Sequence, residues 1–233
     1  MEENRIQSIG ETLTRELEVK NEARERALAD SRATIRNCAH SIRASHRGDL
    51  AGAKELLQAA GEMVTATRAQ LVQTHPGIYW AGYVQDAQKE YAEANITYAV
   101  IADEAIPAAS ELGVEPAAYL NGLGEAAGEM RRYILDIIRH GHAEKCERVL
   151  GVMEDIYSLL VTVDFPDAIT DGLRRTTDMV RGVTERTRGD LTFALQQREL
   201  TSALSKAGIT GALSTGVLSP PIESSEETGE AKE

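Results

Sequence analysis

The chain has 233 residues, which is long enough for one well-cored domain and short for two. Aromatic residues make up only 4% of it, whereas Ala, Leu, Glu and Arg are frequent, and this composition favours helices over sheets. The net charge of −12 argues against a protein that binds any polyanion through its overall charge. The charge is uneven, however, because five Glu and one Lys lie between Glu223 and Glu233. An acidic chain can still bind nucleic acid if its basic groups line one surface.

The sequence contains no apolar run close to the roughly 18 residues that a membrane span needs. Its first residues are charged and contain no apolar signal-peptide core, so we expect a cytoplasmic location and no membrane partner. The two cysteines, Cys38 and Cys146, form no metal-finger spacing and are expected to be buried thiols.

The first 47 residues contain no Pro and one Gly, and their apolar residues recur at steps of three and four. This pattern predicts an amphipathic helix of about 40 residues, about 60 Å long. Gly48 is predicted to end it, and Asp49 to cap the next helix. A helix this long needs a partner surface along its length, which can include another subunit.

Further helices are predicted over residues 50–73, 79–104, 116–140, 144–163 and 168–206, separated by turn signals such as THPG at 74–77. No segment alternates with the period of a strand. Residues from about 208 onward are rich in Gly, Ser, Thr, Pro and Glu, a composition typical of disorder. We therefore expect an all-α protein, an antiparallel bundle of about six to seven helices over residues 1–207, with a disordered acidic tail over 208–233.

Two pairs of carboxylates stand out. Glu90 and Glu93 are three residues apart, and Glu125 and Glu129 are four apart, so each pair shares one helix face. Small residues around the second pair would let another helix or a ligand come close. Two such helices could together hold Mg²⁺ or Mn²⁺, which prefer oxygen ligands. The alternative is a solvated acidic face, because 37 acidic residues produce such spacings by chance.

Basic residues also gather, and Arg outnumbers Lys among them, which suits bidentate contacts with phosphate. The alternative is pairing with acids one helical turn away. The candidate RNA contacts are Arg32, Arg36, Arg43, His46, Arg47, Arg131, Arg132 and Arg139. No Glu is followed three residues later by His, as di-iron helical bundles require, and no P-loop, nucleophile elbow or dinucleotide fingerprint occurs.

From about Arg24 to Arg198 the chain resembles translin and translin-associated factor X (Trax). The resemblance is carried by RATIRNCAHSIRASHRGD (32–49), THPGIYWAGYVQDAQKEYAEA (74–94) and, most specifically, LGVEPAAYLNGLGEAAGEMRR (112–132). It implies an all-helical fold and closed eight-subunit shells that enclose nucleic acid. In this family Trax subunits carry a metal-dependent endoribonuclease site, whereas translin subunits bind RNA and lack the site.

The resemblance also assigns the site. The two acids of the family's Glu-Tyr-x-Glu-Ala segment match Glu90 and Glu93, and an Asp and a Glu four residues apart match Glu125 and Glu129. Glu125 departs from the family's Asp and lengthens the arm by one methylene. We therefore expect a homo-oligomer, an octamer by analogy, in which these four acids hold Mg²⁺ or Mn²⁺ and water is activated against RNA. The alternatives are a translin-like protein that binds single-stranded RNA or DNA without cutting it, and a helical scaffold with neither activity.

Overall fold

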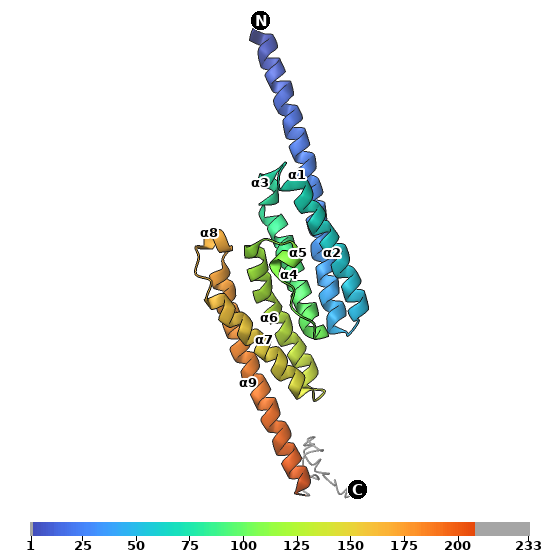
Figure 1. Cartoon of the computed structure of the whole chain (residues 1–233), viewed down its shortest axis with the longest axis vertical. Helices are drawn as coiled ribbons and strands as arrows, with labels where there is room; N and C mark the ends of the chain where they lie inside the picture. The colour runs from blue at the N-terminus through green and yellow to red at the C-terminus, as the bar shows by residue number, and fades with distance from the viewer. Residues whose placement is uncertain (1, 208–233) are drawn as a thin grey trace, which may run out of the picture. The chain divides into compact units, whose positions relative to one another are not determined.

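The computed structural model describes residues 2–207, and this part of the chain contains helices and no strands (Figure 1). Within residues 2–207, six helices have 19 or more residues, and three are single turns. The elements are α1 (Glu2–His46), α2 (Leu50–Leu71), α3 (Pro76–Tyr79), α4 (Gly82–Ala102), α5 (Ala109–Leu112), α6 (Pro116–Ile138), α7 (Ala143–Val161), α8 (Asp167–Thr170) and α9 (Leu173–Lys206). The all-α fold with a long first helix is confirmed, and the predicted tail over 208–233 lies outside the described residues.

Residues up to Leu191 form one compact unit with α4 at its centre. α4 contacts α1, α2, α3 and α6. Its side chains Tyr91, Ile96, Tyr98 and Val100 are buried, as expected for a helix with little free surface. A second unit begins at Thr192, and of it the structure describes the end of α9 and Ala207.

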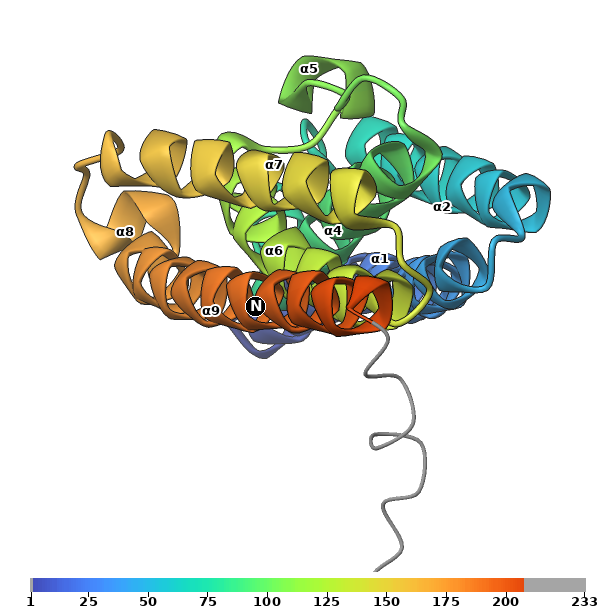
Figure 2. The same cartoon turned by 90° about the horizontal axis from the view of Figure 1, so that it is seen from below.

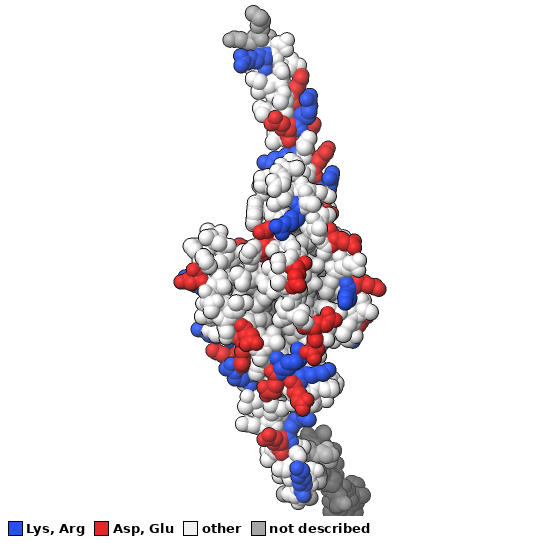
Figure 3. Space-filling view, in the orientation of Figure 1, with Lys and Arg blue, Asp and Glu red and all other residues white. Residues whose placement is uncertain are grey.

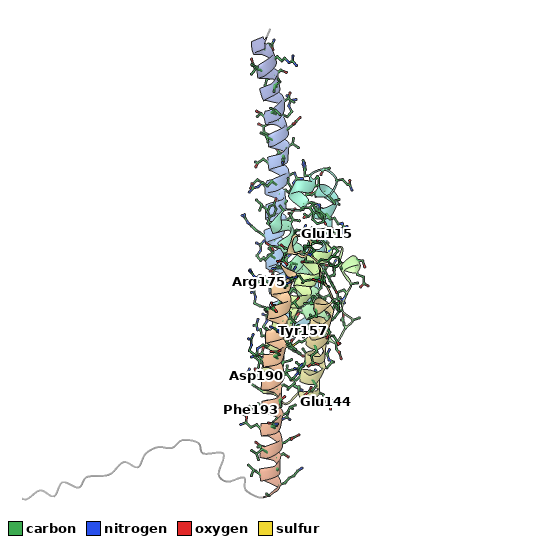
Figure 4. All side chains as sticks on the ribbon, turned by 90° about the vertical axis from the view of Figure 1, so that its left-hand side faces the viewer. Glu115, Glu144, Tyr157, Arg175, Asp190 and Phe193 are labelled. Atoms are coloured by element: carbon green, nitrogen blue, oxygen red, sulfur yellow. The ribbon has the colours of Figure 1, made fainter. Side chains whose placement is uncertain are left out.

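In the first unit α4 runs antiparallel to α2, but in the same direction as its other long neighbours, α1 and α6 (Figure 1). The connection over residues 103–115 carries the chain back to the end of the bundle where α4 begins. Its last residue, Glu115 (labelled in Figure 4), is tied to that end, because its backbone N–H donates to Gln88 and its carboxylate accepts from the hydroxyl of Tyr79. The two helices α4 and α6 are therefore parallel, so that residues later in α4 contact residues later in α6.

α7 then runs alongside the first part of α9, as Figure 2 shows from below. Arg188 of α9 donates to the carboxylate of Glu154 of α7 over 2.7 Å, which ties the two helices together.

Short sequence signals, such as glycines and capping residues, predicted most of the helix ends. Gly48, with φ of +79°, ends α1, and Asp49 caps α2 by accepting from the backbone N–H of Gly52 at 3.0 Å. The last helix was predicted from residue 168, but α9 begins at Leu173. Asp171 and Gly172 both take left-handed φ values, 52° and 76°, and this break separates α8 from α9.

Both cysteines are free and fully buried, as predicted from their helical surroundings. Among residues 2–207, no helix combines the length and the apolar character that crossing a membrane requires.

Candidate metal centre

The face of α4 that meets α6 is charged. Asp86, Lys89, Glu90 and Glu93 are spaced at i, i+3, i+4 and i+7, so they form one stripe along the helix. The other faces of α4 pack against α1 and α2 with apolar side chains. The stripe is therefore held in place by the burial of the rest of the helix.

Close approach of α6 brings its acids to this stripe. A Cβ atom at Gly122 would lie 2.6 Å from the backbone oxygen of Lys89 and 3.0 Å from the backbone nitrogen of Glu93, so only glycine fits there. Glu125 follows almost one turn later on α6 and faces the same stripe. By contrast, a Cβ atom at Gly128 would meet nothing within 4 Å.

Three of the four predicted acids converge. Glu90, Glu93 and Glu125 each offer a carboxylate oxygen, all within 4.8 Å of one another, and each residue is half-buried. We call these three residues the carboxylate cluster. The ammonium of Lys89 borders it, with Nζ 2.8 Å from Oε1 of Glu125 and 3.9 Å from Oε1 of Glu90.

The cluster holds more negative charge than its surroundings favour. Burial, followed by the charges of Glu90, Glu125 and Glu129, raises the pKa of Glu93 from 4.5 to about 8. Burial likewise raises the pKa of Glu90. The nearby thiol of Cys38 has its pKa raised to about 12, first by burial and then by Glu90 and Glu93. Hard oxygen donors with surplus negative charge are the ligand set that fits Mg²⁺ or Mn²⁺.

The fourth acid, Glu129, points to a different partner. Its Oε2 lies 2.5 Å from Nε2 of His46 and 3.6 Å from the Arg132 guanidinium. The hydrogen bond with His46, despite opposing burial, lowers the pKa of Glu129. Glu129 is thus held ionised beside the cluster, and the structure does not bring it into the group of three.

His46 was expected to contact RNA, but its side chain is only 4% exposed. Its Nδ1 is buried and has no hydrogen-bond partner among the described residues. We therefore assign His46 to the support of Glu129 rather than to an RNA surface. Sequence reasoning missed this contact, because 83 residues separate the two side chains and no local spacing indicates it.

With this geometry described, the chain can be compared with known proteins. It matches no model of a protein family. It is 32% identical over 192 residues to an uncharacterized protein of Methanocaldococcus jannaschii, a match that covers 82% of this chain and 84% of the relative. Among solved structures, it is 35% identical to the translin/Trax-type protein AfC3PO, known alone and in a complex with duplex RNA. Those two matches cover 81% of this chain and 97% of that protein, with TM-scores of 0.74 and 0.75.

The chain belongs to the translin/Trax family. NeC3PO, solved in its apo form, shares the translin/Trax fold with a TM-score of 0.72 at 22% identity, and covers 79% of this chain. The resemblance drawn from the motifs at 32–49, 74–94 and 112–132 is thereby confirmed.

In this translin/Trax chain, four of the predicted RNA contacts are exposed and share one helical face, three of them on α1 and the fourth, Arg47, directly after its last residue. Their spacings of 4, 7 and 4 residues place them in one stripe, which is about 22 Å long at 1.5 Å per residue. Within the described part of the chain, their side chains make no hydrogen bond or ion pair. We call these residues the arginine stripe: Arg32, Arg36, Arg43 and Arg47.

The remaining predicted contacts are paired with acids. Arg131 lies 2.8 Å from Asp190 (labelled in Figure 4), and Arg139 lies 3.8 Å from Asp136. Arg132 approaches Glu129. On the face seen in Figure 3, basic and acidic side chains are interleaved and no single basic patch forms. The arginine stripe is therefore the better candidate surface for a polyanion.

Proposed function

We propose that this chain is a metal-dependent endoribonuclease of the translin/Trax family that uses Mg²⁺ or Mn²⁺. The observation that carries the proposal is the convergence of Glu90, Glu93 and Glu125 within 4.8 Å between α4 and α6. Spacing alone shows only that each pair of acids shares a helix face, whereas the tertiary fold brings three of the four acids together as one set of possible ligands. The similarity to AfC3PO, which has been solved with duplex RNA, supports RNA as the substrate class.

Each residue then has a defined task. Glu90, Glu93 and Glu125 would hold the cation, and Glu93 would give up its proton as it does so. His46 and Arg132 keep Glu129 ionised beside them. The arginine stripe would hold the phosphate backbone without reading sequence. A bound divalent ion supplies charge neutralisation at the phosphodiester and a lower pKa for water.

We further propose that the chain forms a homo-oligomer, an octamer that encloses the RNA. The first part of α1 supports self-association, because Ile6, Ile9, Leu13 and Leu17 lie on one face and are each at least 50% exposed. Light scattering at micromolar concentration should return a multiple of the 25.3 kDa chain mass. A monomer mass would contradict this part of the proposal.

Cleavage of a labelled RNA with and without Mn²⁺ tests the catalytic proposal. The parent protein should cut RNA only with the metal, and Glu93→Gln and Glu125→Gln should bind RNA without cutting it. Glu62→Gln is the matched control, because Glu62 is an exposed helical Glu on α2 that, among the residues the structure describes, accepts only from Gln58. Equal loss of cleavage in the control, or cleavage that survives both site changes, would refute the assignment.

A second candidate function is binding of single-stranded RNA or DNA without cleavage. It is favoured by Lys89, whose ammonium lies on Glu125 and partly neutralises the cluster without a metal. In that case the parent protein would shift the RNA in a gel and leave it intact at every Mn²⁺ concentration.

A further inference from the structure

Lys89 is unusual among the charged residues of the site, because it is a cation placed among the residues that would hold a cation. Within residues 4–207, it is the only basic side chain in an ion pair with a member of the carboxylate cluster. Its Nζ lies 2.8 Å from Oε1 of Glu125, a charge-assisted hydrogen bond between α4 and α6.

The ammonium is held by its surroundings and is not a loose surface group. The side chain is 22% exposed. The backbone oxygen of Lys89 is the atom that a Cβ added at Gly122 would meet first, at 2.6 Å, so the main chain at Lys89 is packed against α6. Burial lowers the pKa of Lys89, but the contacts with Glu125, Glu90 and Asp86 outweigh burial and raise it overall, so the group carries its charge.

We propose that Lys89 is the built-in counter-ion of the carboxylate cluster and competes with the divalent ion for Glu125. It thereby sets the affinity of the site for metal. This inference rests on the proposed function, because it concerns the same site. It adds a residue that determines metal affinity and that the two carboxylate pairs alone do not reveal.

The geometry sets the size of the effect. A divalent ion binds a carboxylate oxygen at about 2.1 Å. With Nζ 2.8 Å from Glu125, the ammonium and the ion lie no more than roughly 7 Å apart, even on opposite oxygens. Repulsion between charges of +1 and +2 at that separation weakens binding about tenfold, even at the dielectric constant of water. If the Lys89 ammonium instead moves away from Glu125 when the metal binds, metal binding is weakened as well, because the ion pair between Lys89 and Glu125 must be broken.

The test measures Mn²⁺ binding directly, through the loss of the electron paramagnetic resonance signal of free Mn²⁺. Lys89→Gln replaces the charged group by a polar amide and Lys89→Met replaces it by an apolar group, whereas Lys89→Arg keeps the positive charge. Lys54→Gln, at an exposed position on α2, is the matched control for loss of one positive charge. Both uncharged variants should bind Mn²⁺ about tenfold more tightly than the parent, whereas Lys89→Arg and Lys54→Gln should bind it with nearly parental affinity.

The outcomes separate this inference from the proposed function. If the parent binds Mn²⁺ and cuts RNA but neither uncharged variant binds more tightly, the inference is overturned and the proposed function stands. Equal tightening in Lys89→Arg or Lys54→Gln would also overturn it, because the effect would not come from the charge at this position. If neither the parent nor the Lys89 variants bind Mn²⁺ and no RNA is cut, both fail together.

Discussion

Replacing Glu93 by Gln should stabilise the metal-free protein at neutral pH, although it removes a residue of the site. Folding raises the pKa of Glu93 from 4.5 to about 8, first through burial and then through Glu90, Glu125 and Glu129. Between these two pH values the folded protein holds a proton that the unfolded chain has released. The free energy of unfolding of the parent therefore falls as the pH rises through this window. Gln has no such proton to lose, so the variant avoids this fall.

The size of the effect follows from the same two pKa values. A pH of 7 lies about 2.5 units above the ordinary pKa of 4.5 and still below the pKa of about 8 that Glu93 has in the folded protein. At roughly 1.4 kcal/mol per unit, this costs the parent about 3 kcal/mol. The difference in stability between the variant and the parent should thus be small near pH 4.5, and should grow by about 1.4 kcal/mol per pH unit up to pH 7.

Unfolding by denaturant, followed by circular dichroism at pH 5, 6 and 7 with EDTA present, measures this difference. The protein concentration must be the same throughout, because self-association also shifts apparent stability. Glu62→Gln should show no pH-dependent gain. Adding Mn²⁺ should then stabilise the parent and leave Glu93→Gln nearly unchanged. A difference that does not vary with pH, or a variant less stable than the parent at pH 7, would refute the reasoning.

Four further predictions follow from other parts of the structure. Gly128→Ala should stabilise the protein by about 0.5–1 kcal/mol in thermal unfolding, because Ala favours a helix interior and its Cβ meets no atom. Gly122→Ala should destabilise it by about 1–3 kcal/mol and weaken Mn²⁺ binding, because its Cβ would push α6 away from the Lys89 backbone. Arg43→Ala combined with Arg47→Ala should weaken RNA binding at low salt and flatten its dependence on salt, and an unchanged slope in filter-binding assays would exclude these residues from the interface. Cys38, fully buried and with its pKa raised to about 12, should resist a thiol reagent at pH 8 in the native protein and react after unfolding.

Much of the fold could be predicted because its signals are local. Apolar periodicity predicted α1, and Gly48 with Asp49 marked its end, since a left-handed glycine and a side-chain cap act within one turn. The start of α9 was predicted too early, because nothing in the sequence showed that Asp171 would join Gly172 in a left-handed conformation.

The site depended on information that periodicity does not contain. Spacing shows that Glu90 and Glu93 share a face, but not that this face meets Glu125, and the family resemblance supplied that link. Lys89 was missed as a member of the site, and His46 was predicted as an RNA contact and not as the partner of Glu129, because their partners lie 36 and 83 residues away. Side-chain pairs at such separations are created by packing, here by the close contact at Gly122 and by the last turn of α1.

The central claim is that the carboxylate cluster binds the divalent ion used in RNA cleavage. Anomalous diffraction at the manganese edge, from crystals grown with Mn²⁺, tests it most directly. The account predicts an anomalous peak between α4 and α6, about 2.1 Å from oxygens of Glu90, Glu93 and Glu125, as expected for Mn²⁺ or Mg²⁺ on carboxylates. The absence of a peak there at saturating Mn²⁺, or a peak held by other residues, would contradict it.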